Sequence, residues 1–337
     1  MVFVTGGTGM LGAYLLYYLT LQEEQVVAIK RESSSMKVLE NVFEALSKNP
    51  AEQLAKINWK IADITDYLSI VDAMAGCQWV YHTAAIVSFD ARDKERMLHN
   101  NINGTANVVT AALHTKIKKF CHVSSIASLG ESVDNEEVNE ESKRTSSQLH
   151  SNYSRSKYLS EMEVWRAINE GLEAVIVNPS VILGIGDWKN GSSSMFGQVN
   201  KGFKFYTKGG TGFVDASDVA QSMIKLMKSE VSNQRFVINS ENLAYRKVFD
   251  LIAENLQKPK AQYYASPFLS GIAWRAAGLF SFLLGTKPVL TKETILAANN
   301  TKSYSNNKIK RTIEHNFLKI EDSIKEISQF FVKNKHI

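Results

Sequence analysis

VFVTGGTGMLG, residues 2–12, is the stretch that decides the fold. Val2 to Thr5 form a short apolar run, four of the next seven residues are glycine, and residues 13–21 have a helical composition. Strand, glycine-rich turn and helix in this order are typical of a dinucleotide site. Glycine lets the backbone approach a pyrophosphate, and the helix N-terminus stabilises its negative charge.

The glycine spacing fits two versions of this motif. Gly7, Gly9 and Gly12 satisfy G-x-G-x-x-G, and Gly6, Gly9 and Gly12 satisfy T-G-x-x-G-x-x-G. The residues predicted to contact the cofactor in this turn are Thr5, Gly6, Gly7, Thr8, Gly9, Met10, Leu11 and Gly12.

Apolar strands and helical segments alternate beyond the turn, which predicts an α/β fold with a doubly wound parallel sheet. Further strands are expected near 26–29, 57–62, 79–82, 119–125 and 174–178. Helices are expected at 102–113 and 153–169. Several of these strands are continuously apolar, as expected when helices cover both faces of the sheet.

The end of the second strand bears on the choice of cofactor. An acidic residue there favours NAD by binding the ribose hydroxyls. Here Lys30 and Arg31 follow the strand, and two cations suit the 2′-phosphate of NADP, especially the planar guanidinium of Arg31. Glu32 could instead bind a ribose, so NADP is predicted while NAD remains compatible with the sequence.

The ends of other strands supply further predicted cofactor contacts. Asp63, followed by Ile64, is placed to accept a hydrogen bond from the adenine amino group. The sequence fits nearly as well an exposed aspartate at the end of a strand that contacts no cofactor. The small residues after His82 would let backbone lie against the cofactor, whereas His82 itself is assigned no catalytic role. The candidate contacts are Asp63, Ile64, Thr83, Ala84, Ala85, Pro179 and Ser180.

Tyr153-Ser-Arg-Ser-Lys157, placed 28 residues after Ser125, predicts the reacting centre. A phenol and an ammonium one helical turn apart share a face. A nearby cation favours a phenolate, so Lys157 is expected to lower the pKa of Tyr153 and to bind the nicotinamide ribose. Ser125 is expected to hold the substrate oxygen at a strand end while Tyr153 transfers its proton.

A second copy of the spacing occurs at Tyr304-Ser-Asn-Asn-Lys308. Its consecutive asparagines favour a turn or helix start over a helix interior. No apolar strand ending in Ser-Ser precedes it, so this copy is interpreted as structural.

Composition narrows the class of protein. The 337 residues are 44% hydrophobic and 22% charged with a net charge of +5, and without a basic block nucleic-acid binding is not expected. Cys77 and Cys121 lie in apolar stretches and are predicted to be buried. No Cys/His cluster has metal-ligand spacing, so no metal site is expected. A strand beginning at Val2 leaves no signal peptide, which predicts a cytoplasmic location.

These motifs together resemble the extended short-chain dehydrogenase/reductase family, which includes the NAD-dependent epimerases and dehydratases. The branch resembled is that of the dihydroflavonol 4-reductase and 3β-hydroxysteroid dehydrogenase-like reductases. The matching stretches are TGGTGMLG, YHTAAIVSF, NNINGTANVV, HVSSIASLG, YSRSK, NPSVILGIGD and GFVDASDVA.

The resemblance implies catalytic Ser125, Tyr153 and Lys157, a pyrophosphate loop at Gly6, Gly9 and Gly12, Arg31 at the 2′-phosphate and Asp63 at the adenine. It also implies an asparagine near the active site, for which Asn101 and Asn103 are both candidates. A homodimer through two long helices is a further implication.

The resemblance also implies an NAD(P)-binding Rossmann fold with a smaller, mainly C-terminal substrate domain. Residues 1–178 with 205–240 would form the first domain, and residues 179–204 with 241–337 the second. Asp218 is expected to cap or pair a helix start. The apolar segment 268–285 is interpreted as a packed helix, a lid or a membrane-surface contact. A membrane span is disfavoured by Arg275 near its middle. A lid would predict an apolar substrate.

Three functions follow from the sequence. The leading one is an NADP(H)-dependent oxidoreductase acting on a ketone, an aldehyde or a secondary alcohol. The second is a nucleotide-sugar epimerase or dehydratase that keeps a tightly bound NAD, against which the basic pair at 30–31 argues. The third is a non-catalytic dinucleotide sensor or scaffold, which has no need of a Tyr–Lys pair.

Overall fold

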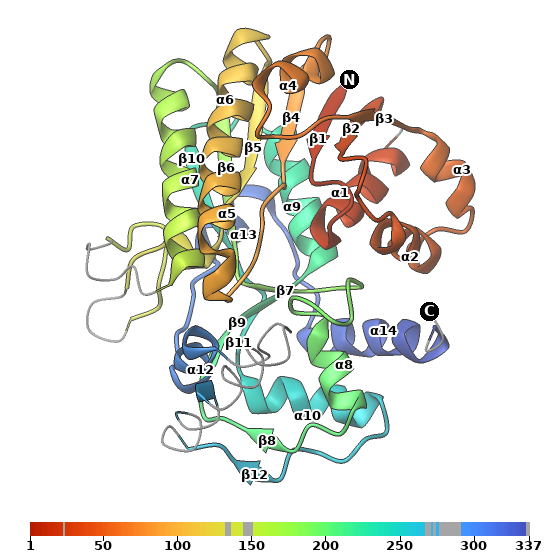
Figure 1. Ribbon diagram of the computed structural model, residues 1–337, viewed down its shortest axis with the longest axis vertical. Helices are drawn as coiled ribbons and strands as arrows, with labels where there is room; N and C mark the ends of the chain where they lie inside the picture. Colours follow the sequence, from red (N-terminus) through yellow and green to blue (C-terminus); the bar gives the residue numbers. More distant parts are fainter. Residues whose placement is uncertain are drawn as a thin grey trace.

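The computed structural model describes residues 1–22, 24–131, 136–143, 151–266, 271, 274–275 and 291–334. In this part of the chain, seven strands form a parallel central sheet in the order β10-β6-β5-β4-β1-β2-β3 (Figure 1). The strands are β1 Val2–Thr5, β2 Val26–Lys30, β3 Ile57–Ile61, β4 Trp79–His82, β5 Lys119–Val123, β6 Ala174–Pro179 and β10 Gln234–Ile238. The predicted doubly wound parallel sheet is confirmed.

Helices cover both faces of this sheet, and neighbouring residues of each strand face opposite cores. Val2 and Val4 belong to one core, whereas Phe3 belongs to the other. The first core contains residues of α1 (Met10–Leu21), α2 (Lys37–Leu46) and α9 (Ala216–Lys228). The second contains residues of α4 (Tyr67–Met74), α6 (Gly104–His114) and α7 (Asn152–Asn169). Burial on both faces explains why the central strands are apolar without alternation, whereas the edge strand β3 carries the polar residues Asn58 and Lys60.

The remaining helices of this half are shorter. They are α3 Pro50–Ala55, α5 Lys94–Leu98, the 3₁₀ turns η1 Ala91–Asp93 and η3 Ile126–Ser128, and the π-helical turn η2 His99–Asn103.

The sheet order reverses between β1 and β4, both of which are central strands. The chain runs from β1 outward through β2 and β3, then returns to the other side of β1 to form β4. In open parallel sheets the crevice for a ligand lies at this point, beyond the carboxyl ends of the strands. The turn at Gly6 and the segment at Thr83 both begin there.

A second group of elements lies below the sheet in Figure 1. Strands β7 (Val181–Leu183), β9 (Gly210–Asp215) and β11 (Glu241–Ala244) form a small mixed sheet, and β8 (Phe205–Tyr206) pairs with β12 (Tyr263–Tyr264). The helices around them are α8 Ser194–Asn200, α10 Tyr245–Asn255, α12 Lys292–Asn299 and α14 Ile320–Lys333. Helix α13 (Asn307–Ile313) instead lies against β10 and α9 of the large sheet (Figure 1).

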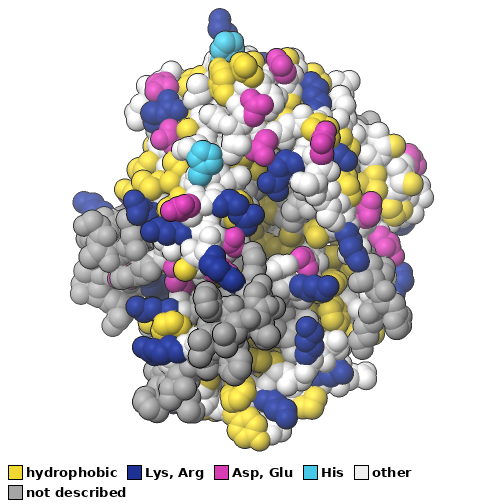
Figure 2. Space-filling model, in the orientation of Figure 1, with side chains coloured by type: hydrophobic (Ala, Val, Ile, Leu, Met, Phe, Trp, Pro, Cys, Tyr) yellow, Lys and Arg dark blue, Asp and Glu magenta, His cyan; other side chains and the backbone are white. Residues whose placement is uncertain are grey.

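Apolar side chains reach the surface at the lower end of this group. Phe205 is 51% exposed and Tyr263 is 56% exposed, and hydrophobic side chains show at the bottom of Figure 2. The segment 268–285 lies outside the described residues except for Gly271, Trp274 and Arg275. Among the described helices, none is both long and apolar enough to cross a membrane.

Asp218 lies in the first turn of α9, as expected, but the cap is a different residue. Asp215 accepts from the backbone N–H of Ser217 at 2.7 Å. Asp218 pairs with His315 Nε2 at 2.8 Å and accepts from the N–H of Leu318 at 2.8 Å. It therefore connects α9 to the segment that leads into α14.

Phe331 anchors α14 by packing edge-to-face against Trp188, with ring centroids 4.9 Å apart. Phe331→Ala is expected to lower the free energy of unfolding by about 3–5 kcal/mol, because it leaves a cavity in the core. Val332 on the same helix is 44% exposed, and its change to alanine should cost less than about 0.5 kcal/mol. Urea denaturation of both variants measures the difference, and equal losses would contradict the packing of α14.

Candidate active site

The glycine turn is built around close backbone contacts. Gly6 has a φ of +72°, and a Cβ there would lie 2.6 Å from the backbone nitrogen of Ala84. A Cβ on Gly12 would lie 2.2 Å from the carbonyl oxygen of Gly6. Both positions therefore exclude any larger residue for reasons internal to the protein.

Gly9 is different, because the fold itself does not require glycine there. Its φ of −84° is open to any residue, and a Cβ would meet only the Gly6 oxygen among the described atoms, at 3.4 Å. Gly9 is exposed at the start of α1, and no described side chain caps this helix. The backbone N–H groups at the start of α1 have no side-chain cap, and Gly9 has no side chain to keep a ligand away from them. Such a helix start suits a pyrophosphate, so this turn fits the dinucleotide that the sequence predicts.

The other residues of the turn lie at different depths. Thr5 is fully buried and its hydroxyl contacts His82 Nδ1 at 2.7 Å, while Gly7 and Leu11 are also buried. Thr8 and Met10 are half-buried, and the Met10 sulfur accepts from Ser193 Oγ at 3.5 Å. The turn therefore presents mainly Thr8, Gly9 and Met10 to the outside.

Lys30 and Arg31 lie at the carboxyl end of β2, as predicted. The Lys30 ammonium lies 5.8 Å from the centroid of the Trp59 ring, a cation–π contact that holds it at the sheet edge. The Arg31 side chain is exposed, and its backbone N–H donates to Ser34 Oγ at 3.1 Å in a tight turn.

Some of the predicted cofactor contacts after β3 and β4 are side chains that already form hydrogen bonds within the protein. Asp63 Oδ1 accepts from the N–H and the hydroxyl of Thr65, at 2.9 and 2.8 Å, whereas Ile64 is buried. Thr83 donates its hydroxyl to the Thr5 carbonyl at 2.7 Å, which fixes the segment after β4 against the glycine turn. Ala84 and Ala85 are half-buried beside it.

Pro179 and Ser180 lie at the end of β6. Ser180 is 5% exposed, and its hydroxyl has no hydrogen-bond partner among the described atoms. Its backbone N–H donates to the Ile238 carbonyl at 3.0 Å. Ser180 therefore offers little exposed surface for the predicted cofactor contact.

Ser125, Tyr153 and Lys157 come together beyond the end of β5. Ser151 caps α7 by accepting from the Ser154 N–H at 2.9 Å, which puts Tyr153 in the first helical turn. The Tyr153 and Ser125 side chains share a hydrogen bond. Lys157, 4% exposed, donates from Nζ to the Val123 carbonyl at 2.7 Å. The three predicted groups therefore meet at one strand end.

Burial controls the ionisation of this cluster. It raises the pKa of Tyr153, and the hydrogen bond with Ser125 opposes that rise. Burial lowers the pKa of Lys157 to about 8, against the opposing charge of Glu161. The expected lowering of the Tyr153 pKa by Lys157 is not found, because the ammonium binds the Val123 carbonyl and desolvation dominates at the phenol. Tyr153 therefore holds its proton at neutral pH.

The two candidate asparagines, Asn101 and Asn103, lie in different surroundings. Asn101 is 1% exposed, and its amide nitrogen donates to Ser156 Oγ on α7 at 3.1 Å. Its side chain also exchanges two hydrogen bonds with the backbone of Ile86, at 2.7 and 2.9 Å. Asn103 is exposed and contacts His99. Asn101 therefore joins the segment after β4 to the helix that carries Tyr153.

Phe89 is a residue of the site that the sequence did not single out. It is 40% exposed, and its ring packs edge-to-face on that of Tyr153 with centroids 5.6 Å apart. Val87 in the same segment is 58% exposed. The accessible surroundings of the phenol on this side are apolar.

His82 and His122 lie side by side within the sheet, with ring centroids 5.4 Å apart. Burial and the nearby Lys157 charge lower the pKa of His82 to about 3, and burial lowers that of His122 in the same direction. Both rings are therefore neutral. His82 binds Thr5 and Thr105, which agrees with a structural role.

The second Tyr-x-x-x-Lys copy is structural. Tyr304 is 7% exposed and forms an isolated β-bridge with Val138, whereas Lys308 lies in α13. Lys308 donates to the Arg235 carbonyl at 3.0 Å. Cys77 and Cys121 are both buried and free, as predicted.

A parallel sheet with a glycine turn at its switch point and a Tyr–Lys pair beside it defines the class of NAD(P)-binding Rossmann proteins. Within that class, the chain belongs to the NAD dependent epimerase/dehydratase family, whose model matches residues 2–239.

Similar proteins include reductases. The chain is 29% identical over 252 residues to a putative dihydroflavonol 4-reductase from Synechocystis sp., covering 73% of this chain and 69% of that protein. It is 26% identical over 276 residues to sterol demethylase protein B from Methylococcus capsulatus, covering 80% and 79%.

Solved structures share the fold at low identity. The crystal structure of gox2253 superposes with a TM-score of 0.83 at 23% identity, covering 100% of this chain and 99% of that chain. DesIV, a dTDP-glucose 4,6-dehydratase from Streptomyces venezuelae with NAD and TYD bound, gives 0.79 at 15% identity and covers 99% and 97%.

Gly9 and Gly12 provide a matched pair of substitutions. Gly12→Ala should lower the free energy of unfolding by about 1–3 kcal/mol, because its Cβ collides with the Gly6 carbonyl. Gly9→Ala should cost less than about 1 kcal/mol, because alanine is a poorer helix N-cap than glycine, but it should weaken dinucleotide binding, because its Cβ would project toward the predicted pyrophosphate position. Thermal unfolding and nicotinamide fluorescence separate the two effects. NADPH affinity unchanged in Gly9→Ala would contradict the predicted site.

Proposed function

We propose that the protein is an NADP(H)-dependent oxidoreductase that acts on a ketone or aldehyde, or on the corresponding secondary alcohol. The observation that carries this proposal is the pairing of the Tyr153 and Ser125 side chains beyond the end of β5, beside the switch point of the sheet, where a dinucleotide would bind. The bound nicotinamide would supply or accept the hydride.

The chain's own groups would move the proton. Tyr153 keeps its proton at neutral pH because burial raises its pKa, so it is suited to protonate the oxygen of a carbonyl as that carbonyl is reduced. Ser125 would donate a hydrogen bond to the same oxygen. The Lys157 ammonium, buried one turn from Tyr153, would donate a hydrogen bond to a hydroxyl of the nicotinamide ribose and so hold the nicotinamide beside the phenol.

The preference for NADP rests on the end of β2. The exposed guanidinium of Arg31 and the ammonium of Lys30 place positive charge where a 2′-phosphate would lie. Gly9 and the uncapped start of α1 would hold the pyrophosphate. Asp63 retains one carboxylate oxygen for the adenine, since the other is taken by Thr65.

An apolar substrate is supported by the segment after β4. Phe89 packs on the phenol with part of its ring exposed, and Asn101 holds the backbone of this segment at Ile86. A substrate carbonyl at Tyr153 would have this aromatic side chain as its neighbour. The similarity to a putative dihydroflavonol 4-reductase supports reduction of a carbonyl group.

Tyr153→Phe tests the proposed proton donor. The change should lower kcat by about 10²–10⁴-fold, because it removes the transferable proton while the ring still fills its place. NADPH affinity should stay within about twofold of wild type. Tyr158→Phe, on another side of the same helix, is the matched control. Carbonyl-dependent oxidation of NADPH measures turnover, and a fully active Tyr153→Phe enzyme would reject the mechanism.

Arg31→Ala tests the choice of cofactor. Loss of a charge-assisted contact with the 2′-phosphate should weaken NADPH binding by about 10- to 100-fold and leave NADH binding unchanged. Nicotinamide fluorescence titrations with both dinucleotides measure this directly. If wild type prefers NADH, and if protein purified with bound NAD converts a sugar nucleotide without added cofactor, the epimerase or dehydratase function replaces this proposal.

A further inference from the structure

Glu161 is a fully buried carboxylate on α7, one helical turn beyond Lys157. Its Oε2 atom accepts from Ser124 Oγ at 2.6 Å, from Ser128 Oγ at 2.7 Å and from Asn178 Nδ2 at 2.9 Å. A buried charge persists only when it is paired and hydrogen-bonded, and these donors meet that requirement. Donors from the end of β5, from η3 and from β6 therefore surround the Glu161 carboxylate.

The other carboxylate oxygen points toward the edge of the sheet. Oε1 accepts from Arg235 on β10 and from Trp165 Nε1, both at 3.2 Å. Burial alone raises the pKa of Glu161, but hydrogen bonds from Ser124 and Ser128 and the charge of Arg235 bring it below the ordinary value. Glu161 is therefore ionised.

Asn178 and Ser128 also lie against Ser125. Asn178 Nδ2 carries two hydrogens, so it can donate both to Glu161 and to the Ser125 carbonyl, which is 3.2 Å away. The Ser128 hydroxyl carries one proton, which Glu161 Oε2 at 2.7 Å and the Ser125 carbonyl at 2.8 Å share. Both side chains reach Glu161 as well, and Ser124 precedes Ser125 in the chain. The carboxylate thus fixes the turn that presents the Ser125 hydroxyl to Tyr153.

Glu161 also supplies negative charge near Lys157. Tyr153 and Glu161 lie one turn to either side of Lys157 on α7, and the charge of this ammonium also acts on His82 of β4 and His122 of β5. Tyr153 keeps its proton and the two histidines are neutral, so the anion of this set is Glu161. Burial lowers the pKa of Lys157, and the Glu161 charge opposes that change.

We propose that Glu161, anchored by Arg235, is a positioning residue for the reaction: it holds the turn that carries Ser125 and places a buried negative charge one helical turn from Lys157. The proposal deepens the proposed function and rests on it. The Glu161 side chain is fully buried and its hydrogen bonds go to protein groups, so it would act through Ser125 and Lys157.

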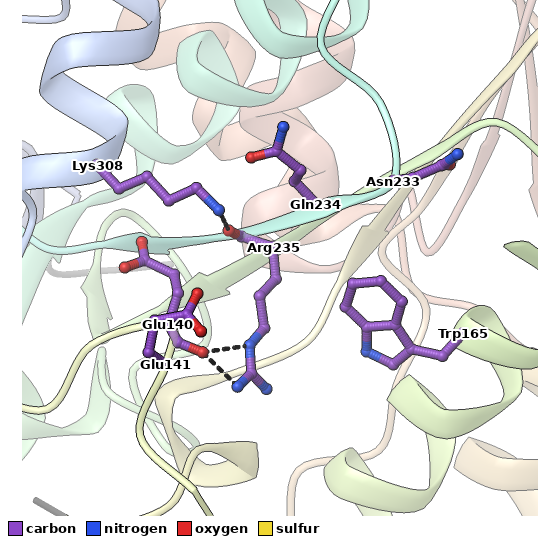
Figure 3. A pocket seen from close by; sticks show the side chains of 7 residues that line it. All are labelled: Glu140, Glu141, Trp165, Asn233, Gln234, Arg235 and Lys308. Atoms are coloured by element: carbon purple, nitrogen blue, oxygen red, sulfur yellow. Dashed lines mark hydrogen bonds between the residues drawn. The ribbon is translucent and has the colours of Figure 1, made fainter.

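Arg235, the ion-pair partner of Glu161, is partly exposed to solvent. Its side chain is 23% exposed and lines an open cavity of about 480 Å³ together with Trp165, Glu140 and Lys308 (Figure 3). There its guanidinium donates from Nε to the Glu140 carbonyl at 2.9 Å. Removing the Glu161 charge leaves a cation that water can solvate, whereas removing Arg235 leaves a buried anion unpaired. Glu161→Gln is therefore the variant expected to fold.

Glu161→Gln should lower the pH at which Lys157 loses its proton by about 1 unit, because an opposing charge is removed. Protonated Lys157 is the active form, so the alkaline loss of kcat should move to lower pH by the same amount. Glu163→Gln, on the same helix and paired with the partly exposed Arg166, is the matched control and should change neither.

The Lys157 midpoint is measured by titrating its ¹³Cε resonance, assigned by its loss in Lys157→Met, without substrate. Equal midpoints in Glu161→Gln, Glu163→Gln and wild type would overturn the charge role. Ser128→Ala tests the positioning role separately. It should lower kcat by about 10-fold through Ser125 with the Lys157 midpoint unchanged, and a wild-type kcat would overturn that part.

These readouts separate this proposal from the function on which it rests. A lowered Lys157 midpoint in Glu161→Gln, with no carbonyl reduction even by wild type, would reject the oxidoreductase and leave the charge effect of Glu161 in place. If wild type reduces carbonyls, and if the Lys157 midpoint in Glu161→Gln and kcat in Ser128→Ala both equal the wild-type values, only the positioning role of Glu161 is rejected. If Glu161→Gln does not fold, Ser128→Ala still tests the tie to Ser125.

Discussion

A charged lysine in the interior of a protein needs compensation, and Lys157 is the clearest case in this structure. Its ammonium is 4% exposed and binds the carbonyl oxygen of Val123 at the last position of β5. Desolvation works against the charge, so its persistence depends on what surrounds it. Two neutral histidines add no repulsion, and the ionised Glu161 one turn away supplies attraction. The proposed chemistry at Tyr153 depends on this balance.

The order of strands in the sheet brings the compensating groups together. Arg235 and Glu161 are 74 residues apart in sequence, and they meet because β10 adds to the sheet beside β6. Asn178, the residue before the last of β6, lies next to the Ser124 turn that follows β5. Parallel strands put all their carboxyl ends at one edge, so a crevice, a proton donor and their supporting polar network share that edge.

The sequence predicted the parts of the site that depend on local pattern. The glycine turn, the strand that precedes it and the Tyr153–Lys157 helix follow from spacing within one strand–turn–helix unit or one helix. The asparagine-rich copy at Tyr304 was correctly separated by its turn-forming residues. The local pattern did not reveal that Gly9, unlike Gly12, has no packing reason to be glycine. That distinction requires the position of the Gly6 carbonyl.

Other features could not be predicted because they depend on sheet order or on irregular helix geometry. The π-helical turn at His99–Asn103 changes the helical period, so the sequence could not tell whether Asn101 or Asn103 faces α7. The roles of Glu161 and Phe89 require neighbours from distant segments. The pKa of Tyr153 was expected to fall, but desolvation at the strand end dominates over the i+4 cation.

The most direct test is a crystal structure of the protein with NADP⁺. The account predicts the 2′-phosphate on Arg31, the pyrophosphate against Gly9 at the start of α1, and the nicotinamide ring beside the Tyr153 hydroxyl. Lys157 should reach a hydroxyl of the nicotinamide ribose at about 2.6–3.2 Å. A dinucleotide bound in the crevice with its nicotinamide beyond reach of Tyr153 and Lys157 would contradict the account.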